Sequence, residues 1–330
     1  MNAELLPENP MAPLLTVSGL QVNMRSEQGV INIIRDVSFE LHPGETLGIV
    51  GESGSGKSVT CLSLLRLIAS PPAVYQHGAV EFKGKDLWQS SEQELLKIRG
   101  QDIAFIFQEA MSALNPVMKV GEQAAEVLVY HQGLSRHQAR ENVIALFKQV
   151  GISLPERRFD QYPHQLSGGL QQRVMIAMAL ACGPDLLIAD EPTTALDVTI
   201  QVQILELLKT LQQTHHMSMI FISHDLGVIA EICQRVLVMY AGQIVESAPI
   251  EELFSVPKHP YTRLLLDTIP DINKPRGAFA AIPGQIPSPT DIPSGCAFHP
   301  RCPEADNTCT RQEPSLKNLT PKHRVRCWHR

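Results

Sequence analysis

The chain has 330 residues, 44% of them apolar, which is enough for two domains with a sizeable core. Its 28 basic and 34 acidic residues give a net charge of −6. This acidic balance argues against a protein whose main partner is DNA or RNA, so we expect no nucleic-acid partner.

Two observations bear on the compartment. Residues 1–13 lack the basic and then apolar pattern of a secretory signal. No uncharged apolar run reaches the ~18 residues that a membrane span needs. We therefore expect a cytosolic chain whose contact with any membrane goes through partner proteins.

The first fifty residues are predicted to be mostly strand. Apolar and β-branched runs at 15–17, 20–22, 31–34 and 37–41 are separated by turn-forming residues, which favours four short strands at an antiparallel sheet edge. A fifth apolar run, at 46–50, leads directly into a glycine-rich segment. A second strand pair is expected at 79–82 and 103–107.

The glycine-rich segment is Gly51-Glu52-Ser53-Gly54-Ser55-Gly56-Lys57-Ser58, which fits the phosphate-loop pattern G-x-x-x-x-G-K-[ST]. A chance glycine-rich turn is disfavoured, because a strand precedes the loop and helical spacing follows it. Such a loop points its N–H groups at phosphate oxygens, while its lysine reaches the β/γ-phosphates and its last hydroxyl binds Mg²⁺. The residues expected to bind ATP and Mg²⁺ here are Gly51, Ser53, Gly54, Ser55, Gly56, Lys57, Ser58 and Val59.

A change to helical composition follows. Residues 121–131 are helical in composition, and Ser135 with Gln138 forms a capping box before an apolar helix face at residues 139–150. We expect a helical subdomain at about residues 111–170, inserted into an α/β core. Within it, Ser167 is a natural N-cap, and Gly168 and Gly169 open the next helix.

That glycine-bearing helix start is a second anion site. In one chain it would compete with residues 51–58 for the same phosphates. Presentation to the γ-phosphate of a neighbouring chain is therefore the better use, although the segment alone fits an ordinary capped helix equally well.

Polar residues end three of the predicted core strands. The run at 186–190 is continuously apolar, as in a parallel strand buried on both faces, and ends in Asp190 and Glu191. We interpret Asp190 as a Mg²⁺ partner and Glu191 as a general base, rather than as a solvated acidic turn. Gln108, a candidate for Mg²⁺ or the attacking water, and His224 also follow strands, at the edge where ligands bind in open α/β sheets.

Taken in order, these segments resemble the ATP-binding cassette of ABC transporters. The resemblance covers roughly residues 14–250 and implies a Q-loop at Gln108, a D-loop at residues 195–197 and a switch histidine at His224. It also implies that two cassettes stack head to tail, so that each ATP lies between one phosphate loop and the other chain's signature. The residues implied to act across that interface are Ser167, Gly168, Gly169 and Gln171, with Asp197 in the D-loop. Because Glu191, His224 and Gln108 are all present, the resemblance implies a working ATPase.

The fold expected from this resemblance is α/β, with a RecA-like P-loop NTPase core, an N-terminal antiparallel β subdomain and an inserted helical subdomain. We expect the nucleotide-binding domain at residues 14–252 and a cysteine-containing extension at residues 253–330. Ten of the 24 prolines lie between Pro257 and Pro303, so we expect a loop-rich appendage rather than a continuation of the sheet.

The extension is similar to the ATP-binding subunits of bacterial oligopeptide, dipeptide and nickel importers. The matching stretches include residues 259–262, 282–284 and 300–303. Four thiols lie in this segment, which is poor in apolar residues, at Cys296, Cys302, Cys309 and Cys327. Their wide spacing suits a cysteine-held iron cluster at least as well as zinc, which usually takes tighter pairs, and four unrelated thiols are the plain alternative. The resemblance implies a [4Fe–4S] cluster.

The function implied is that of an ATP-hydrolysing subunit on the cytoplasmic face of the bacterial inner membrane, which powers peptide import. The implied partners are a second ATPase chain, expected to be a paralogue, two transmembrane permease subunits and an extracytoplasmic substrate-binding protein. Nickel, a metallophore or an opine is an alternative cargo. The rival class is a soluble ABC ATPase that acts on nucleic acid or ribosomes, but residues 59–165 hold no sustained heptad and the chain has one cassette.

Overall fold

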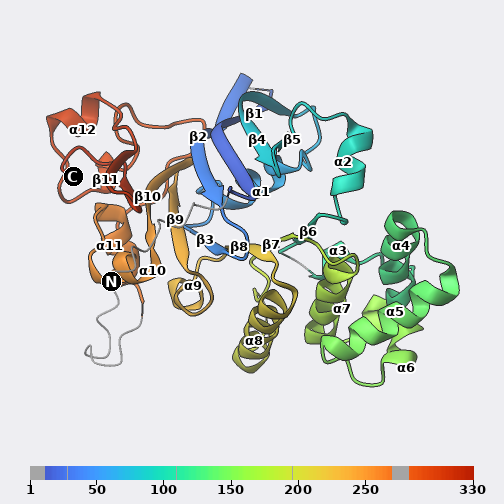
Figure 1. The fold of residues 1–330 in the computed structure, drawn as a ribbon. Coiled ribbons are helices and arrows are strands. Elements are labelled where there is room, and N and C mark those ends of the chain that lie inside the picture. Colours follow the sequence, from blue (N-terminus) through green and yellow to red (C-terminus); the bar gives the residue numbers. More distant parts are fainter. Residues whose placement is uncertain (1–11, 28, 109, 195, 270–281) are drawn as a thin grey trace, which may run out of the picture.

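A computed structural model describes residues 12–27, 29–108, 110–194, 196–269 and 282–330. Figure 1 shows antiparallel strands at the top, a central sheet with helices below it, a helical group at the lower right and the C-terminal extension at the left. The strand order is β5-β4-β1-β2-β10-β9-β3-β8-β7-β6. Among the described helices, none has both the length and the apolar character to cross a membrane.

The antiparallel strands are β1 (Leu15–Ser26), β2 (Gly29–Leu41), β4 (Ala73–Phe82) and β5 (Lys85–Asp86). The prediction of four short strands before residue 42 was wrong in number, because two long strands cover the same residues. The β1–β2 register shifts between Val17 and Leu20, where Gly19 has a φ of +58°. A bulge of this kind interrupts the sequence pattern without ending the strand.

The parallel strands are β3 (Thr46–Val50), β6 (Ile103–Ile106), β7 (Leu186–Asp190), β8 (Ser218–Ile222) and β9 (Arg235–Tyr240). Every residue of β3, β7 and β8 is buried, which explains their continuous apolar runs. The expected pairing of 79–82 with 103–107 was wrong. β4 pairs antiparallel with β1, and β6 pairs parallel with β7, so neither strand pairs with the other.

Helices α1 (Lys57–Leu64), α2 (Glu92–Ile98), α8 (Val198–His215) and α9 (Leu226–Ile232) connect these strands. β10 (Gln243–Pro249) lies antiparallel to β9 and meets β2 through the single parallel pair Gln243 and Asp36. β10 therefore joins the antiparallel and parallel parts of the sheet.

The helical group contains α3 (Ala110–Ala113), α4 (Val120–Gln132), α5 (Arg136–Gln149), α6 (Pro155–Phe159), η1 (Pro163–Gln165) and α7 (Gly168–Leu180). The predicted capping box is confirmed, since the Ser135 hydroxyl accepts from the Gln138 N–H and the Gln138 side chain accepts from the Ser135 N–H. α7 contacts α3, α4, α5 and β6. It thus carries the helical group on the edge of the sheet (Figure 1).

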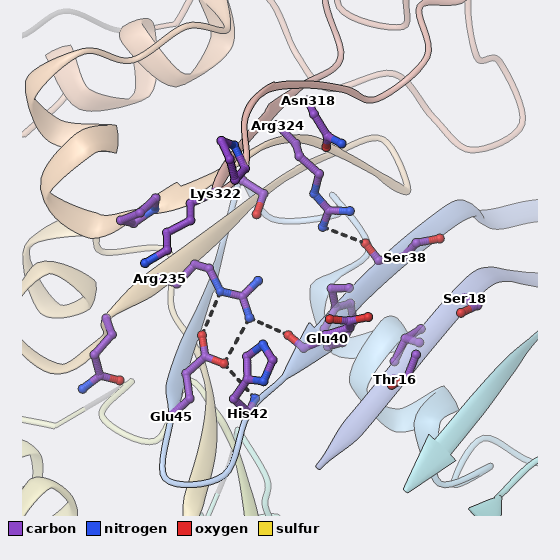
Figure 2. Close-up of a pocket in the computed structure, with 16 residues that line it drawn as sticks. Thr16, Ser18, Ser38, Glu40, His42, Glu45, Arg235, Asn318, Lys322 and Arg324 are labelled. Carbon is purple, nitrogen blue, oxygen red and sulfur yellow. Dashed lines mark hydrogen bonds and ion pairs between the residues drawn. The ribbon is translucent and has the colours of Figure 1, made fainter. Parts of the chain in front are cut away.

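The extension consists of α10 (Ile250–Ser255), α11 (Pro260–Asp267), η2 (His299–Arg301), α12 (Asn307–Arg311), β11 (Lys317–Thr320) and β12 (His323–Val325). Contrary to expectation, it continues the sheet, because β12 pairs antiparallel with β10. The paired stretch is too short to give a strand pattern in the sequence. Figure 2 shows the adjoining contact, in which Arg324 of β12 donates to the Ser38 carbonyl of β2 at 3.2 Å.

Candidate active site

The phosphate loop connects β3 to α1 in a conformation that requires glycine. Gly51 has a φ of +153°, and a Cβ there would lie 2.3 Å from the Met239 carbonyl oxygen. Gly56 is the N-cap of α1 with a φ of +101°. The loop therefore turns tightly against β9 and presents the first turn of α1 to a ligand.

Lys57 and Ser58 start α1 beside the end of β7. The Lys57 ammonium donates to the Gly51 carbonyl at 2.8 Å and to the Glu52 carbonyl at 3.1 Å. Burial lowers the pKa of Lys57, opposed by the charges of Glu191, Asp190 and Glu52. The Ser58 hydroxyl donates to the Asp190 carboxylate at 3.0 Å. A hydroxyl and a carboxylate side by side are hard oxygen ligands of the kind that Mg²⁺ takes, so this donor pair fits the ion.

A second group converges on one oxygen of Glu191. Its Oε2 accepts from Gln108 Nε2 at 3.2 Å and from the Thr194 hydroxyl at 2.9 Å, and lies 3.1 Å from His224 Nδ1. The Glu191 side chain is 11% exposed and that of His224 62%. The strand ends thus bring Gln108, Glu191 and His224 together. The Thr194 hydroxyl was not predicted from the sequence. The available signal was its position, three residues after the predicted base Glu191.

Burial also raises the pKa of the neighbouring carboxyl, Asp190, against the opposing hydrogen bond from Ser58. Glu191 itself has a φ of +46°, and its N–H donates to the Ile222 carbonyl of β8 at 3.0 Å. This uncommon conformation for a non-glycine residue turns Glu191 away from the end of β7 toward Gln108 and His224.

The start of α7 is separate from the phosphate loop and from the group around Glu191. Ser167 is its N-cap, exposed and without a side-chain cap hydrogen bond, and Gly168 is also exposed. A Cβ on Gly169 would lie 3.0 Å from Ile200 of α8, so this end of α7 packs on α8. Asp197 is the exposed N-cap of α8, while Ala195 lies outside the described residues. Among the described residues, no hydrogen bond joins residues 166–173 to the phosphate loop.

The structure does not support the prediction for Gln171. It was expected among the signature residues that face a partner chain, but its side chain is buried, 4% exposed. Its amide nitrogen donates to the Pro163 carbonyl at 2.8 Å and to the Leu166 carbonyl at 3.2 Å. Helical periodicity accounts for the difference, because Gln171 lies one turn into α7 on the face toward η1. Gln171 therefore shapes the turn that carries Ser167.

A cavity of about 600 Å³ lies at the opposite edge of the sheet from the phosphate loop (Figure 2). His42 and Glu45, before β3, and Arg235, at the start of β9, line it together with the β11–β12 hairpin. Arg235 forms an ion pair with Glu45 at 2.8 Å. Because the phosphate loop follows the other end of β3, this cavity is not part of the nucleotide site.

The four cysteines of the extension lie close enough to affect one another electrostatically. Burial raises the pKa of Cys296 to about 11, and Cys309, Cys302 and Cys327 add to the rise. No three of these thiols meet the spacing expected around one ion. The described residues that do are Asp306, Cys309 and His329, with Cys309 Sγ 3.6 Å from His329 Nε2. Asp306 and His329 were not predicted.

A phosphate loop on a parallel sheet, with polar residues at the neighbouring strand ends and a helical group that carries an exposed glycine-bearing helix start, defines an ABC-type ATPase. The sequence profile described as ABC transporter matches residues 34–194. A second profile, oligopeptide/dipeptide transporter C-terminal region, matches residues 245–309. The chain belongs to the ATP-binding subunits of the oligopeptide/dipeptide branch of the ABC transporter family.

Similarity to known relatives extends over nearly the whole chain. The chain is 47% identical to the oligopeptide transport ATP-binding protein AppD of Bacillus subtilis, over 96% of this chain and 97% of that one. It is 49% identical to OppD of the same organism, over 96% and 88%. Among solved structures, the dimeric post-hydrolysis cassette MJ0796 bound to ADP and Pi is 28% identical, with a TM-score of 0.64 over 72% of this chain and 98% of that one. The predicted RecA-like ABC ATPase fold and ATPase class are thereby confirmed.

Proposed function

We propose that this protein hydrolyses ATP to power the uptake of dipeptides or oligopeptides across the bacterial inner membrane, bound at its cytoplasmic face. The observation that carries the proposal is the convergence of Gln108, Thr194 and His224 on Glu191, beside the Lys57 and Ser58 of an intact phosphate loop. The full-length similarity to peptide-import ATP-binding proteins supports the choice of cargo.

In this mechanism the Glu191 carboxylate takes the proton of the attacking water. Gln108 and Thr194 orient this carboxylate by donating to Oε2, and His224 closes the group from the solvent side. Lys57 gives up its carbonyl partners to phosphate oxygens when nucleotide enters the loop. Ser58 and Asp190 would hold Mg²⁺, which when bound neutralises charge on the β- and γ-phosphates.

The active unit is proposed to contain two cassettes. Ser167 and Gly168 are exposed on their own chain, and Gly169 beside them is partly exposed, so this helix start is available to the nucleotide of a second chain. There the Ser167 hydroxyl and the N-terminus of α7 would stabilise negative charge on the γ-phosphate. We infer that the second chain is a paralogous ATPase, that two permease subunits span the membrane, and that an extracytoplasmic binding protein delivers the peptide.

The cysteines of the extension are proposed to hold a [4Fe–4S] cluster through Cys296, Cys302, Cys309 and Cys327. In such a cluster each of the four cysteines would bind a different iron, so the thiols need not meet at a single ion. When bound, it would cross-link four separate segments of the extension. Iron and sulfide in the anaerobically purified chain, lost when Cys296 and Cys302 become serine, would support the cluster. One zinc per chain, lost in His329→Ala, would instead place a single ion at Asp306, Cys309 and His329.

The transport function is tested in vesicles that contain this chain together with the proposed permeases and second ATPase. Uptake of labelled peptide should require the loaded binding protein and internal ATP, and Lys57→Ala should abolish it. A Lys209→Ala variant, on the exposed face of α8, serves as the matched lysine control and should transport normally. Peptide-independent ATP hydrolysis together with peptide-insensitive uptake of a nickel chelate would contradict the proposed cargo.

A further inference from the structure

The phosphate loop is held by the C-terminal extension. Glu52, the second residue of the loop, forms a two-pronged ion pair with Arg301, with Nη1 2.8 Å from Oε2 and Nη2 3.0 Å from Oε1. The Arg301 side chain is 5% exposed and that of Glu52 29%. Two parallel charge-assisted hydrogen bonds fix orientation as well as distance.

The extension also holds the backbone of the same residue. The Glu52 N–H donates to the Tyr261 hydroxyl of α11 at 2.9 Å. Tyr261 is fully buried and packs edge-to-face on Tyr240, with ring centroids 4.8 Å apart. It also packs on Phe298 in a tilted arrangement, with ring centroids 5.4 Å apart. Arg301 is anchored in turn, since its Nε donates to the Pro283 carbonyl at 2.7 Å. Both the backbone and the side chain of Glu52 are thus set by the extension.

The position of Glu52 matters for charge. Its carbonyl accepts from the Lys57 ammonium, and its carboxylate is one of the charges that act on Lys57. An unpaired carboxylate so close to the lysine would compete with phosphate for that lysine and repel a triphosphate. Arg301 neutralises the carboxylate and directs it toward the extension. Ile286 lies close to the loop as well, 3.7 Å from where a Cβ on Gly54 would be.

We propose that the C-terminal extension completes the phosphate loop, with Arg301 as a positioning residue that sets the loop's affinity for a nucleoside triphosphate through Glu52. Arg301 stands directly before Cys302. Any change that displaces Arg301 from Glu52 would therefore weaken nucleotide binding, although no residue of the extension needs to touch the nucleotide.

The test measures binding of a fluorescent ATP analogue with Mg²⁺ to the full chain. Arg301→Met should weaken binding about tenfold, the loss expected when a charge pair is broken and one charge remains. Glu52→Gln should bind within about threefold of the parent, because it removes the repelling charge as well. The double variant should recover the affinity of Glu52→Gln. Equal affinity of Arg301→Met and the parent, or a double variant as weak as Arg301→Met, would overturn the proposal.

Arg326 provides the matched control. Like Arg301, it is buried, precedes a cysteine (Cys327) and pairs with the body of the protein, here with Asp36 of β2 at 3.0 Å. Arg326→Met should lower the melting temperature as Arg301→Met does, yet leave nucleotide affinity unchanged. A loss of affinity in both would show that a loosened extension, and not Glu52, is responsible.

Tyr261→Phe gives an independent variant should Arg301→Met fail to fold. It keeps the buried ring and removes only the hydroxyl that accepts from the Glu52 N–H. We expect a folded protein with nucleotide affinity reduced about threefold to fivefold. Unchanged affinity in a folded Tyr261→Phe protein would contradict the role assigned to the backbone contact.

Discussion

The ring of His323 lies between two carboxylates, with Nε2 2.8 Å from Glu246 Oε1 and Nδ1 2.8 Å from Glu252 Oε1. The side chains of His323 and Glu246 are fully buried. Glu246 also accepts from the N–H groups of Lys258 and His259, at 2.7 and 2.8 Å. This network ties β12 to β10 and to the start of α11, and so fixes the extension on the sheet.

His323→Leu should destabilise the protein by about 3 kcal/mol, because it leaves the buried Glu246 carboxylate without its imidazole partner. Chemical denaturation measures the loss, and limited proteolysis should find the extension cut first. His137→Leu is the control, since the ion pair of His137 with Glu141 is exposed on both sides and its removal should cost under about 0.5 kcal/mol. Equal losses in the two variants would contradict the role of the network.

Acid should weaken the same region through His259. Burial lowers the pKa of His259 to about 3, and its Nδ1 accepts from the Tyr261 N–H at the start of α11. The unfolded chain, with a histidine pKa of about 6.5, binds more protons than the folded one between pH 6.5 and 3. Stability therefore falls as the pH drops below about 6.5, by up to about 1.4 kcal/mol per pH unit from this group.

His259→Asn separates this contribution from the rest. Asparagine keeps a short acceptor at the N-cap and does not titrate. The free energy of unfolding, measured from pH 7.5 to 5, should fall less steeply in the variant than in the parent. Parallel curves would show that His259 is not the group responsible.

The candidate site was largely predictable because its chemistry follows local patterns. The phosphate loop is recognised from its fixed pattern of glycine, lysine and serine residues. Gln108, Glu191 and His224 each follow a buried parallel strand, and strands of one parallel sheet bring their carboxyl ends together. The capping box of Ser135 was equally local.

The misses share a different physical origin, which is contact between segments that no local pattern relates. Glu52 and Arg301 are 249 residues apart, and only the folded extension brings them together. The place of β12 beside β10 and the pairing of β6 with β7 likewise join segments about 80 residues apart in the sequence. Gln171 belongs to a recognisable sequence segment, but the burial of its side chain depends on which face of α7 it occupies.

Ser167 should matter to turnover and hardly at all to stability. Its hydroxyl makes no cap hydrogen bond, so Ser167→Ala should change the free energy of unfolding by less than about 0.5 kcal/mol. Ser135→Ala removes a working capping box and should cost about 1 kcal/mol. In the assembled transporter the order should reverse, with ATP hydrolysis reduced by Ser167→Ala and spared by Ser135→Ala. A stable, fully active Ser167→Ala transporter would rule out the role across the dimer.

Glu191→Gln tests the proposed general base. The amide keeps the shape of the side chain but cannot take a proton, so phosphate release by the assembled transporter should fall about 10²–10⁴-fold. Nucleotide affinity should persist, because no hydrogen bond joins Glu191 to the described residues of the phosphate loop. The closed dimer should accumulate with ATP trapped in it. Thr194→Val, which removes only one donor to Oε2, should lower the rate about tenfold while leaving the base intact. Glu206→Gln, on the exposed face of α8, is the matched control and should leave the rate unchanged. Full turnover by Glu191→Gln would assign the proton to another acceptor, whereas a larger loss in Thr194→Val than in Glu191→Gln would mean that the hydroxyl acts on the water directly.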